Sequence, residues 1–294
     1  MSTLTNQNQI HSSNHCIAIA GHLGSFHHEA AQAYFGRDVA VAEHGDFAST
    51  VASLKTGRCS NAILAIENTV AGSILANYRL IFDEDVKVLG EVFLPIELHL
   101  MGVKGATLHR ATSVQSHPIA LRQCADFLGR HPHLTVIEKN DTASCARDVS
   151  AQGDPSTLVV AGLACAKRYN LEILVPRIEK SPRNFTRFLI LSKIDNPVSG
   201  ANKATLSFSL RNLPGTLARF LQTIHAHEVN LCGIQSLPLL QEIDNYQFYA
   251  DLEYRPETDT TRLFKALEDQ ANTFRILGKY QSNDQRNSTL PQNL

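Results

Sequence analysis

Residues 184–191 read Asn-Phe-Thr-Arg-Phe-Leu-Ile-Leu and follow the turn signal Ser181-Pro182. Their aromatic and branched side chains are typical of a β-strand. In a purely structural strand we would expect Leu or Val where Thr186 and Arg187 stand. A hydroxyl and a guanidinium among apolar neighbours favour a site that binds a small anion and donates a hydrogen bond. An edge strand with a hydrogen-bonded Thr186 and a surface Arg187 is the alternative interpretation.

The length and charge of the chain limit the classes of protein to consider. With 294 residues, the chain is long enough for two domains that each bury a core. Its 27 basic and 28 acidic residues give a formal net charge of −1 and form no run of like charge. This balance argues against nucleic acid or an anionic membrane as the main partner.

The cysteines, the histidines and the N-terminus indicate the cellular compartment and whether a metal is expected. Six scattered cysteines form no CxxC pair, which indicates reduced thiols in a cytosolic protein. The 13 histidines lack the HExxH spacing of a zinc site, so we expect no metal. Residues 1–15 are polar, without a secretory h-region, and no uncharged stretch reaches the ~18 apolar residues of a membrane span. We therefore predict a cytoplasmic protein.

Two strand ends in the first part of the chain carry candidate ligand-binding groups. Residues 16–35 read as strand, glycine turn and helix, a geometry that presents N–H groups to an anion around Gly24 and Ser25. A plain turn is an equal alternative, because the G-x-G-x-x-G spacing is absent. Residues 62–66 are a continuous apolar run, typical of a strand buried on both faces, and Glu67-Asn68-Thr69 follow where open α/β sheets bind ligands. A helix N-cap would explain part of this second pattern.

The next segment predicts a second lobe. Residues 86–103 alternate as extended chain that crosses over, and βα units then restart. A strand at 112–115 leads into Ser116-His117-Pro118, which suits a helix start, and Asn140-Asp141-Thr142 caps another helix. We predict two parallel-sheet lobes with a cleft between them over residues 16–195.

The C-terminal part has a different pattern. Residues 194–202 have the turn-rich composition of a linker. Residues 203–280 then predict the order βαββαβ, which is a ferredoxin-like unit. Such a sheet has an open face and edges that usually pair with another copy, so we expect a homo-oligomer.

Five motifs together resemble those of prephenate dehydratases, in the same order and spacing. They are Gly21-x-x-Gly24-Ser25-Phe26, Ile66-Glu67-Asn68-Thr69 with Gly72, Ser116-His117-Pro118 with Gln123-Cys124, Asp141-Thr142-Ala143, and Asn184-Phe185-Thr186-Arg187-Phe188. The C-terminal unit, with Leu213-Pro214-Gly215-Thr216-Leu217 and Asn230-Leu231 ahead of Ile234-Gln235-Ser236-Leu237-Pro238, resembles the ACT regulatory domain of those enzymes.

The resemblance implies a fold, an activity and a regulator. The fold would be α/β, with a two-lobed catalytic domain like a periplasmic binding protein over residues 16–195 and a ferredoxin-like ACT domain over residues 203–280. The activity would be that of a carbon–oxygen lyase, which converts prephenate to phenylpyruvate in phenylalanine biosynthesis without a cofactor. L-Phenylalanine would bind the ACT domain as a feedback inhibitor of a homodimer or homotetramer. There are two competing hypotheses: that the substrate is arogenate, or that the protein is a non-catalytic amino-acid or anion sensor with the same two-lobed fold.

Thr186 is the residue to which we assign the central chemical role. Its hydroxyl would donate a hydrogen bond to the departing hydroxyl of prephenate, as the resemblance also implies. Arg187 suits bidentate binding of a carboxylate. Successive side chains of a regular strand point to opposite faces, however, so either the strand begins irregularly or Arg187 acts from behind Thr186.

The remaining candidates orient the substrate or bind the effector. Asn68, Ser116 and Gln123 can orient a dianion without repelling it, whereas Glu67 would have to be protonated or paired, or would instead brace the lobes. The other predicted substrate-binding residues are Gly24, Ser25, Thr69, His117, Thr142, Asn184 and Phe188. The predicted effector-binding residues are Pro214, Gly215, Thr216, Leu217, Asn230, Leu231, Gln235 and Ser236.

Two departures from the family pattern weaken parts of this assignment. Ile119 stands where many relatives have Gln, and Gln235 and Leu237 replace the Glu and Arg of the common Glu-Ser-Arg-Pro. The first removes one polar contact from the catalytic part. The second leaves the identity of the effector open.

Overall fold

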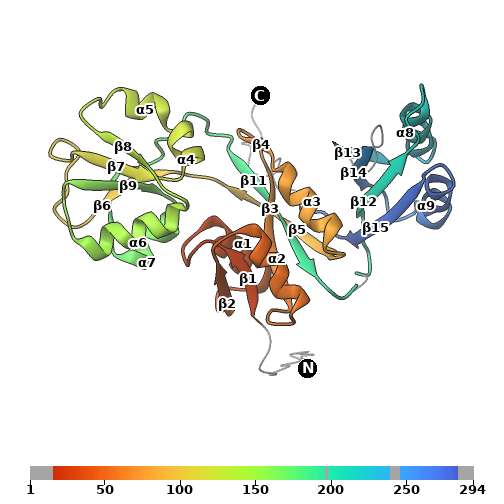
Figure 1. Cartoon of the computed structure of the whole chain (residues 1–294), viewed down its shortest axis with the longest axis horizontal. Helices are drawn as coiled ribbons and strands as arrows, with labels where there is room; N and C mark the ends of the chain where they lie inside the picture. Colours follow the sequence, from red (N-terminus) through yellow and green to blue (C-terminus); the bar gives the residue numbers. More distant parts are fainter. Residues whose placement is uncertain (1–15, 196–197, 239–245, 284–294) are drawn as a thin grey trace, which may run out of the picture.

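A computed structural model describes residues 16–195, 198–238 and 246–283 of the chain. Residues 1–15, where the sequence suggested no targeting segment, lie outside the described part. Three sheets follow one another in space: the first lobe lies between the second lobe and the C-terminal domain (Figure 1). In the described part, no helix is both long enough and apolar enough to cross a membrane.

The first lobe is built on a sheet with the strand order β2-β1-β3-β11-β5 and a short β4 paired to β3. Its strands are β1 (Ile17–Ala20), β2 (Val41–His44), β3 (Asn61–Asn68), β4 (Gly72–Ser73), β5 (Lys87–Pro95) and β11 (Phe185–Ser192). Its helices are α1 (Phe26–Phe35), α2 (Phe47–Lys55) and α3 (Leu75–Asp83). Residues of α1 pack on one face of the sheet, and residues of α2 and α3 pack on the other.

The second lobe has a sheet of order β10-β6-β9-β7-β8. Its strands are β6 (His99–Gly102), β7 (Ser113–Ser116), β8 (Thr135–Glu138), β9 (Thr157–Ala161) and β10 (Glu172–Val175). The helices α4 (Pro118–Gln123) and α5 (Ala125–Gly129) cover one face, and α6 (Thr142–Gln152) and α7 (Leu163–Tyr169) cover the other.

The expectation of two parallel sheets is wrong in one respect, because both sheets are mixed. β11 runs antiparallel to both β3 and β5, and β6 runs antiparallel to β9 and β10. The reason is the chain path: after building the second lobe, the chain returns to insert β11 into the first sheet. The stretch from Asn184 onward therefore begins where the lobes meet.

Two segments, residues 96–98 and 176–184, cross between the lobes. These two crossings are hydrogen-bonded to each other. The Ile96 N–H donates to the Asn184 carbonyl at 2.7 Å, and the Ile178 N–H donates to the Leu98 carbonyl at 2.8 Å. The Leu98 N–H in turn donates to Glu179 Oε2 at 2.9 Å. The connection is thus a short two-stranded ribbon.

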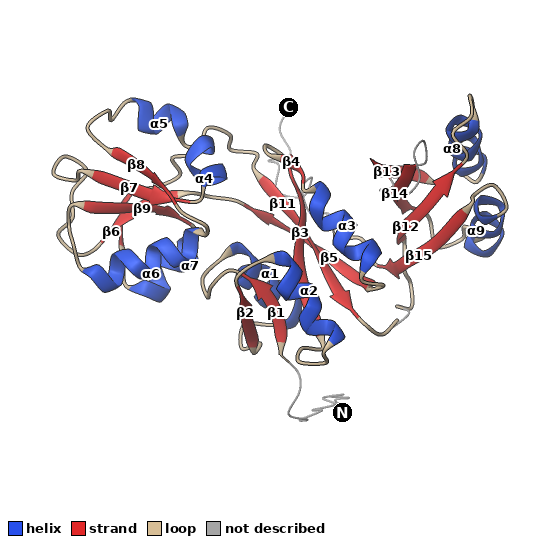
Figure 2. Cartoon of the chain, viewed as in Figure 1, coloured by secondary structure: helices blue, strands red, loops and turns tan. Residues whose placement is uncertain are grey.

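The C-terminal domain has the expected βαββαβ order. It consists of β12 (Lys203–Leu210), α8 (Thr216–Ala226), β13 (Asn230–Pro238), β14 (Tyr246–Glu253), α9 (Thr260–Glu268) and β15 (Thr273–Tyr280). The strands pair antiparallel in the order β13-β14-β12-β15. The helices lie on the side of this sheet that faces away from the first lobe (Figure 2).

The other face of the C-terminal sheet packs on the first lobe. Tyr249 of β14 lies against Tyr78 and Phe82 of α3, with ring centroids 5.4 and 6.4 Å apart. The backbone at Gly278 approaches β5 so closely that a Cβ there would lie 1.8 Å from the Val88 carbonyl oxygen. Only glycine permits this docking.

A buried ion network crosses the same interface. The Arg187 guanidinium of β11 binds Glu91 Oε2 at 2.8 Å, the Asp251 carboxylate, and the Tyr280 hydroxyl at 3.1 Å. Lys203 Nζ binds Glu91 Oε1 at 2.9 Å. The two cations thus compensate two buried carboxylates. Although burial alone would raise the pKa of Asp251, the Arg187 guanidinium holds it below its usual value.

We predict that Arg187→Met destabilises the protein. Glu91 and Asp251 would then share one cation, and breaking a buried ion pair in this way costs about 3–5 kcal/mol. The measurement is the free energy of unfolding in urea at pH 7, with the exposed Lys193→Met of the same strand region as the control. A loss below about 1 kcal/mol would show that the network adds no more than a surface pair.

Candidate active site

Asn68 and Thr186 face each other where β3 ends and β11 begins. The two residues are direct partners in the antiparallel pair, and the register shifts between Arg187 and Phe188, which leaves Ile66 as an extra residue on β3. Asn68 Nδ2 lies 3.0 Å from Thr186 Oγ1 and 2.8 Å from Asn184 Oδ1. Irregularities of this kind re-aim side chains beside functional sites.

The orientation of the Asn68 amide fixes the direction of these hydrogen bonds. Asn68 Oδ1 accepts the backbone N–H groups of Val70 at 3.0 Å and Ala71 at 2.7 Å, so Nδ2 must be the donor. Thr186 Oγ1 therefore accepts from Asn68. No described residue accepts the hydroxyl proton of Thr186, which is therefore available for another acceptor.

Gln123 brings the second lobe into the same cluster. Its Nε2 donates to Asn68 Oδ1 at 3.3 Å, and its Oε1 accepts from Asn184 Nδ2 at 3.1 Å. Thr69 clamps the start of β11, because its hydroxyl accepts the Phe185 N–H at 3.0 Å and donates to the Arg183 carbonyl at 3.0 Å. We call Asn68, Gln123, Asn184 and Thr186 the amide–hydroxyl cluster; it is uncharged and spans both lobes.

A pocket of about 400 Å³ opens beside the amide–hydroxyl cluster. It draws residues from the β3–β4 turn, from α4 and from the second crossing. Its lining residues are Val70, Ala71, Ile119, Arg122, Gln123, Glu179, Lys180, Ser181 and Asn184. We call this space the interlobe pocket; Gln123 and Asn184 belong both to it and to the cluster.

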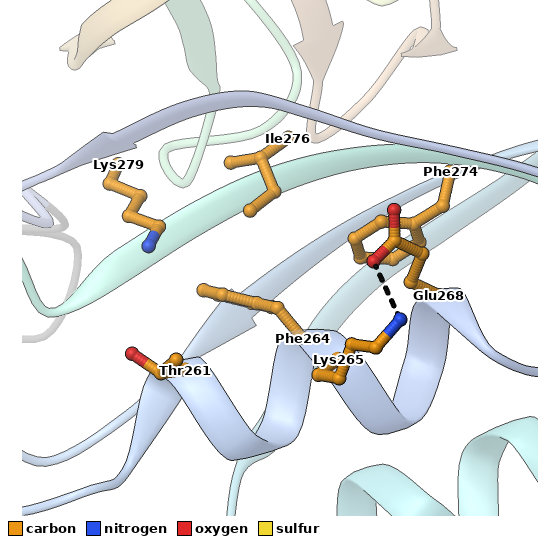
Figure 3. Close-up of a pocket in the computed structure, with 7 residues that line it drawn as sticks. All are labelled: Thr261, Phe264, Lys265, Glu268, Phe274, Ile276 and Lys279. Atoms are coloured by element: carbon orange, nitrogen blue, oxygen red, sulfur yellow. Dashed lines mark ion pairs between the residues drawn. The ribbon is translucent and has the colours of Figure 1, made fainter.

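Another pocket lies on the C-terminal domain between α9 and β15 (Figure 3). Both of its lysines have partners: Lys265 pairs with Glu268 at 3.6 Å, and Lys279 Nζ lies 4.6 Å from the centre of the Phe264 ring. This pocket contains none of the predicted site residues, and its cations already have partners. We therefore place the candidate active site between the lobes.

Arg187 and Glu67 lie on the face of the first sheet opposite to Thr186. Arg187 is directly paired with Glu67 across the strands, and its guanidinium is buried in the ion network with Glu91 and Asp251. The prediction that Arg187 binds a substrate carboxylate is therefore withdrawn, because the pleat turns it toward the C-terminal domain. Glu67 shares that face and does not line the interlobe pocket, so its role stays a prediction.

Ser116 and His117 serve the second lobe itself. The Ser116 side chain is fully buried, and its hydroxyl donates to the Val160 carbonyl at 2.6 Å. His117 caps α4, with Nδ1 accepting the Ile119 N–H at 3.2 Å. The structure thus replaces the predicted substrate contact of Ser116 with a bond between β7 and β9.

The turn at residues 21–25 is not an open anion cradle. Two of its central N–H groups already have side-chain acceptors: the Leu23 N–H donates to Glu43 Oε1 at 2.8 Å, and the Gly24 N–H donates to His28 Nδ1 at 3.0 Å. The Ser25 hydroxyl is buried and caps α1 by accepting the His28 N–H. The plain-turn alternative is therefore the correct one for Gly24 and Ser25.

Two further predicted residues also lie outside the interlobe pocket. Phe188 is buried in the core of the first lobe, where the His27 ring meets it edge-on at 5.0 Å. Thr142 is the first residue of α6, whose cap is the neighbouring Asp141. Neither side chain lines the pocket.

Sequence reasoning missed the contacts that hold the lobes together. His22 Nδ1 lies 3.0 Å from Asp141 Oδ2, and the Tyr169 hydroxyl donates to the Leu23 carbonyl at 2.6 Å. It also missed Arg122 and Lys180 of the pocket. A signal existed for Arg122, which directly precedes the predicted Gln123, but a lone surface arginine carries no spacing motif.

The predicted effector residues occupy two exposed elements of the C-terminal domain. Gly215, at φ +82°, precedes α8 after the exposed Pro214, and the Thr216 hydroxyl donates to the Leu213 carbonyl at 2.9 Å. Asn230 begins the edge strand β13. Further along β13, Gln235 Nε2 donates to Ser73 Oγ at 2.9 Å and so contacts the first lobe. Leu217, Leu231 and Ser236 lie in the same two elements.

Burial strongly shifts the pKa of two titratable side chains of α1, His27 inside the first lobe and Glu29 facing the second. Burial lowers the pKa of His27 to about 4, so the neutral ring accepts the Ala65 N–H at 3.3 Å. Burial raises the pKa of Glu29 from 4.5 to about 7, with Lys167 opposing the shift. Glu29 Oε1 has no hydrogen-bond partner in the described part of the chain and faces Gly162, where α7 begins.

We predict that Glu29 makes stability decrease as pH rises from about 4.5 to about 7. The folded chain binds this proton more tightly than the unfolded chain does, so the penalty is complete only above the folded pKa. Glu29→Gln should flatten the profile and stabilise the protein at pH 8 by about 1–3 kcal/mol. The measurement is urea unfolding between pH 5 and 8, with the exposed Glu172→Gln as the control. Parallel profiles for Glu29→Gln and the wild type would contradict the prediction.

Comparison with known proteins places this geometry in a family. The family model for prephenate dehydratase matches residues 17–196. The chain belongs to the prephenate dehydratase family. A bifunctional chorismate mutase/prephenate dehydratase from Aquifex aeolicus is 30% identical over 266 residues, which cover 90% of this chain and 73% of that relative.

Solved structures show the same fold. A structure described as a novel type of quorum quenching acylase superposes with a TM-score of 0.83 at 29% identity, over 92% of this chain and 99% of that one. The prephenate dehydratase of Arthrobacter aurescens, solved in complex with L-Phe, gives a TM-score of 0.82 at 23% identity, over 92% and 90%. At that identity the second likeness shows the fold alone, so site roles in this prephenate dehydratase homologue must come from its own residues.

Proposed function

We propose that this protein converts prephenate to phenylpyruvate by decarboxylating dehydration. The observation that carries the proposal is the Thr186 hydroxyl, which accepts from Asn68 and keeps its proton for an acceptor beside the interlobe pocket. Family membership supplies the reaction class. The two lobes with their double crossing also suit the closing motion of periplasmic binding proteins, which we propose for substrate capture.

For the bond-breaking step itself, the protein has to orient the substrate and donate one hydrogen bond to the departing oxygen. The ring carboxylate leaves as carbon dioxide, its bonding electrons enter the ring, and the opposite C–O bond breaks to release hydroxide. Thr186 stabilises the negative charge that develops on this oxygen. Asn68, Asn184 and Gln123 hold the substrate without placing a negative charge against its carboxylates. Aromatisation supplies the driving force.

Two other activities are separable from this one. Arogenate carries an ammonium group in place of the keto oxygen, so a comparison of kcat/KM for the two substrates identifies the preferred one. The likeness to a quorum quenching acylase makes amide hydrolysis a second candidate. In the described part, Thr186 Oγ1 contacts an amide rather than a base, and hydrolysis through an activated hydroxyl needs a base.

We predict that Thr186→Ala lowers kcat by about 100- to 1,000-fold with a smaller change in KM. The lost hydrogen bond acts mainly in the transition state, where the departing oxygen is charged. Thr186→Ser keeps the hydroxyl and is the matched control, expected to retain most of the turnover. The measurement is steady-state formation of phenylpyruvate. Equal losses in kcat and substrate affinity would reduce Thr186 to a positioning role.

We also propose that the C-terminal domain is an ACT domain that binds L-phenylalanine and inhibits the enzyme. The Arthrobacter aurescens protein was solved with L-Phe, which supports this ligand class. Gln235, on an effector-motif strand, bonds Ser73 of β4. β4 pairs with the end of β3 that carries Asn68. This gives a short physical route from effector to site, provided L-phenylalanine binds two states unequally.

Ser73→Ala should weaken the inhibition while L-phenylalanine still binds. The substitution removes the acceptor of the Gln235 bond but none of the predicted effector residues. We expect the maximal inhibition to fall about threefold or more, which corresponds to a loss of ~0.7 kcal/mol of coupling. Inhibition curves and calorimetric titration with L-phenylalanine measure the two effects, with the exposed Gln222→Ala as the control. Unchanged inhibition would exclude this route.

The assembly and location remain predictions. Within the described ranges β13 pairs only with β14, so its outer edge is open to a second copy, in line with a homodimer or homotetramer. Cys59, Cys124, Cys145 and Cys165 are buried free thiols, a pattern that suits the reducing cytoplasm.

A further inference from the structure

The proposed substrate needs a positive charge that the amide–hydroxyl cluster does not supply. Prephenate carries two carboxylates, and the cluster around Thr186 is uncharged. Arg187, the cation expected from the sequence, is committed to Glu91 and Asp251 on the other face of the sheet. The charge must therefore come from elsewhere in the lining of the interlobe pocket.

Two cations line the interlobe pocket, and one of them has no hydrogen-bond or ion-pair partner among the described residues. Lys180 Nζ forms an ion pair with Asp126 at 3.2 Å. Arg122 makes no ion pair and no hydrogen bond through its side chain to the residues that the structure describes. Its charge acts on the neighbouring His117, whose pKa is lowered mainly by burial and further by Arg122. Arg122 directly precedes Gln123, which ties the pocket to Asn68.

Of the two substrate carboxylates, only one suits such a partner. The ring carboxylate loses its charge as carbon dioxide forms, so an arginine bound there would stabilise the substrate more than the transition state. The side-chain carboxylate keeps its charge in substrate, transition state and product. An arginine on this group strengthens binding without slowing the chemistry.

We propose that Arg122 binds the side-chain carboxylate of the substrate, and so takes the place that the sequence assigned to Arg187. The inference rests on the proposed function for the identity of the substrate. It does not rest on turnover, because phenylpyruvate carries the same carboxylate and can be titrated directly. The arginine guanidinium can donate two parallel N–H bonds to the two oxygens of a carboxylate, whereas the lysine ammonium is a single point charge.

The test is Arg122→Gln in the full-length protein, measured in two ways. We expect the KM for prephenate to rise about 10- to 100-fold, with kcat within about threefold of the wild type. The calorimetric Kd for phenylpyruvate should rise by a similar factor. Arg122→Lys should recover part of both. The control is Arg130→Gln, because Arg130 lies 5.9 Å over the Phe127 ring and does not line the pocket.

The outcomes separate the inference from the proposed function. If the wild type turns over prephenate and Arg122→Gln leaves KM and the phenylpyruvate Kd unchanged, the role of Arg122 is overturned. A kcat that falls as far as kcat/KM would also overturn it. If the wild type binds phenylpyruvate but does not turn over prephenate, the proposed function fails, while a weaker Kd in Arg122→Gln still supports Arg122. A wild type that shows neither turnover nor phenylpyruvate binding would overturn both.

Discussion

The alternation of side chains along β11 is the constraint on which the rest of the structure depends. Because neighbouring residues of a strand point to opposite faces, Thr186 and Arg187 cannot serve the same site. Thr186 turns toward Asn68 where the lobes meet. Arg187 turns toward Glu91 and Asp251, where the C-terminal domain docks. The proposed reacting hydroxyl and the main interdomain cation thus belong to adjacent residues of one strand, on opposite faces of the sheet.

The uncharged character of the amide–hydroxyl cluster suits the dianionic substrate that we propose for it. Two backbone N–H groups fix the orientation of the Asn68 side-chain amide. Thr186 Oγ1 therefore accepts from Asn68, and the Thr186 hydroxyl proton is available for the substrate. A carboxylate here would repel a dianion, and a cation on the leaving carboxylate would stabilise the ground state. We therefore assign the positive charge to the lining of the interlobe pocket, where Arg122 lies, and not to the uncharged cluster around Thr186.

The sequence predicted those parts of the molecule that local pattern determines. Strand alternation and helix spacing gave the βαββαβ order, and the polar end of the apolar run at residues 62–66 gave Asn68. The mixed sheets were missed because strand order depends on the path of the chain through the second lobe. The anion cradle was wrong because its N–H groups meet Glu43 and His28, which no spacing rule anticipates. Ser116 has the expected position but is buried behind its bond to Val160.

The placement of β11 also connects the C-terminal domain to the candidate site, which supports the regulation proposed above. The buried network leaves Arg187 little freedom, since it contacts both carboxylates and Tyr280 at once. A change in how β15 and β14 dock must therefore move Arg187 or break these bonds, and breaking buried pairs costs several kcal/mol. Moving Arg187 moves the backbone that carries Thr186. Together with the Gln235–Ser73 bond on the other edge of β3, this links both partners of the Asn68–Thr186 pair to the C-terminal domain, as the proposed regulation requires.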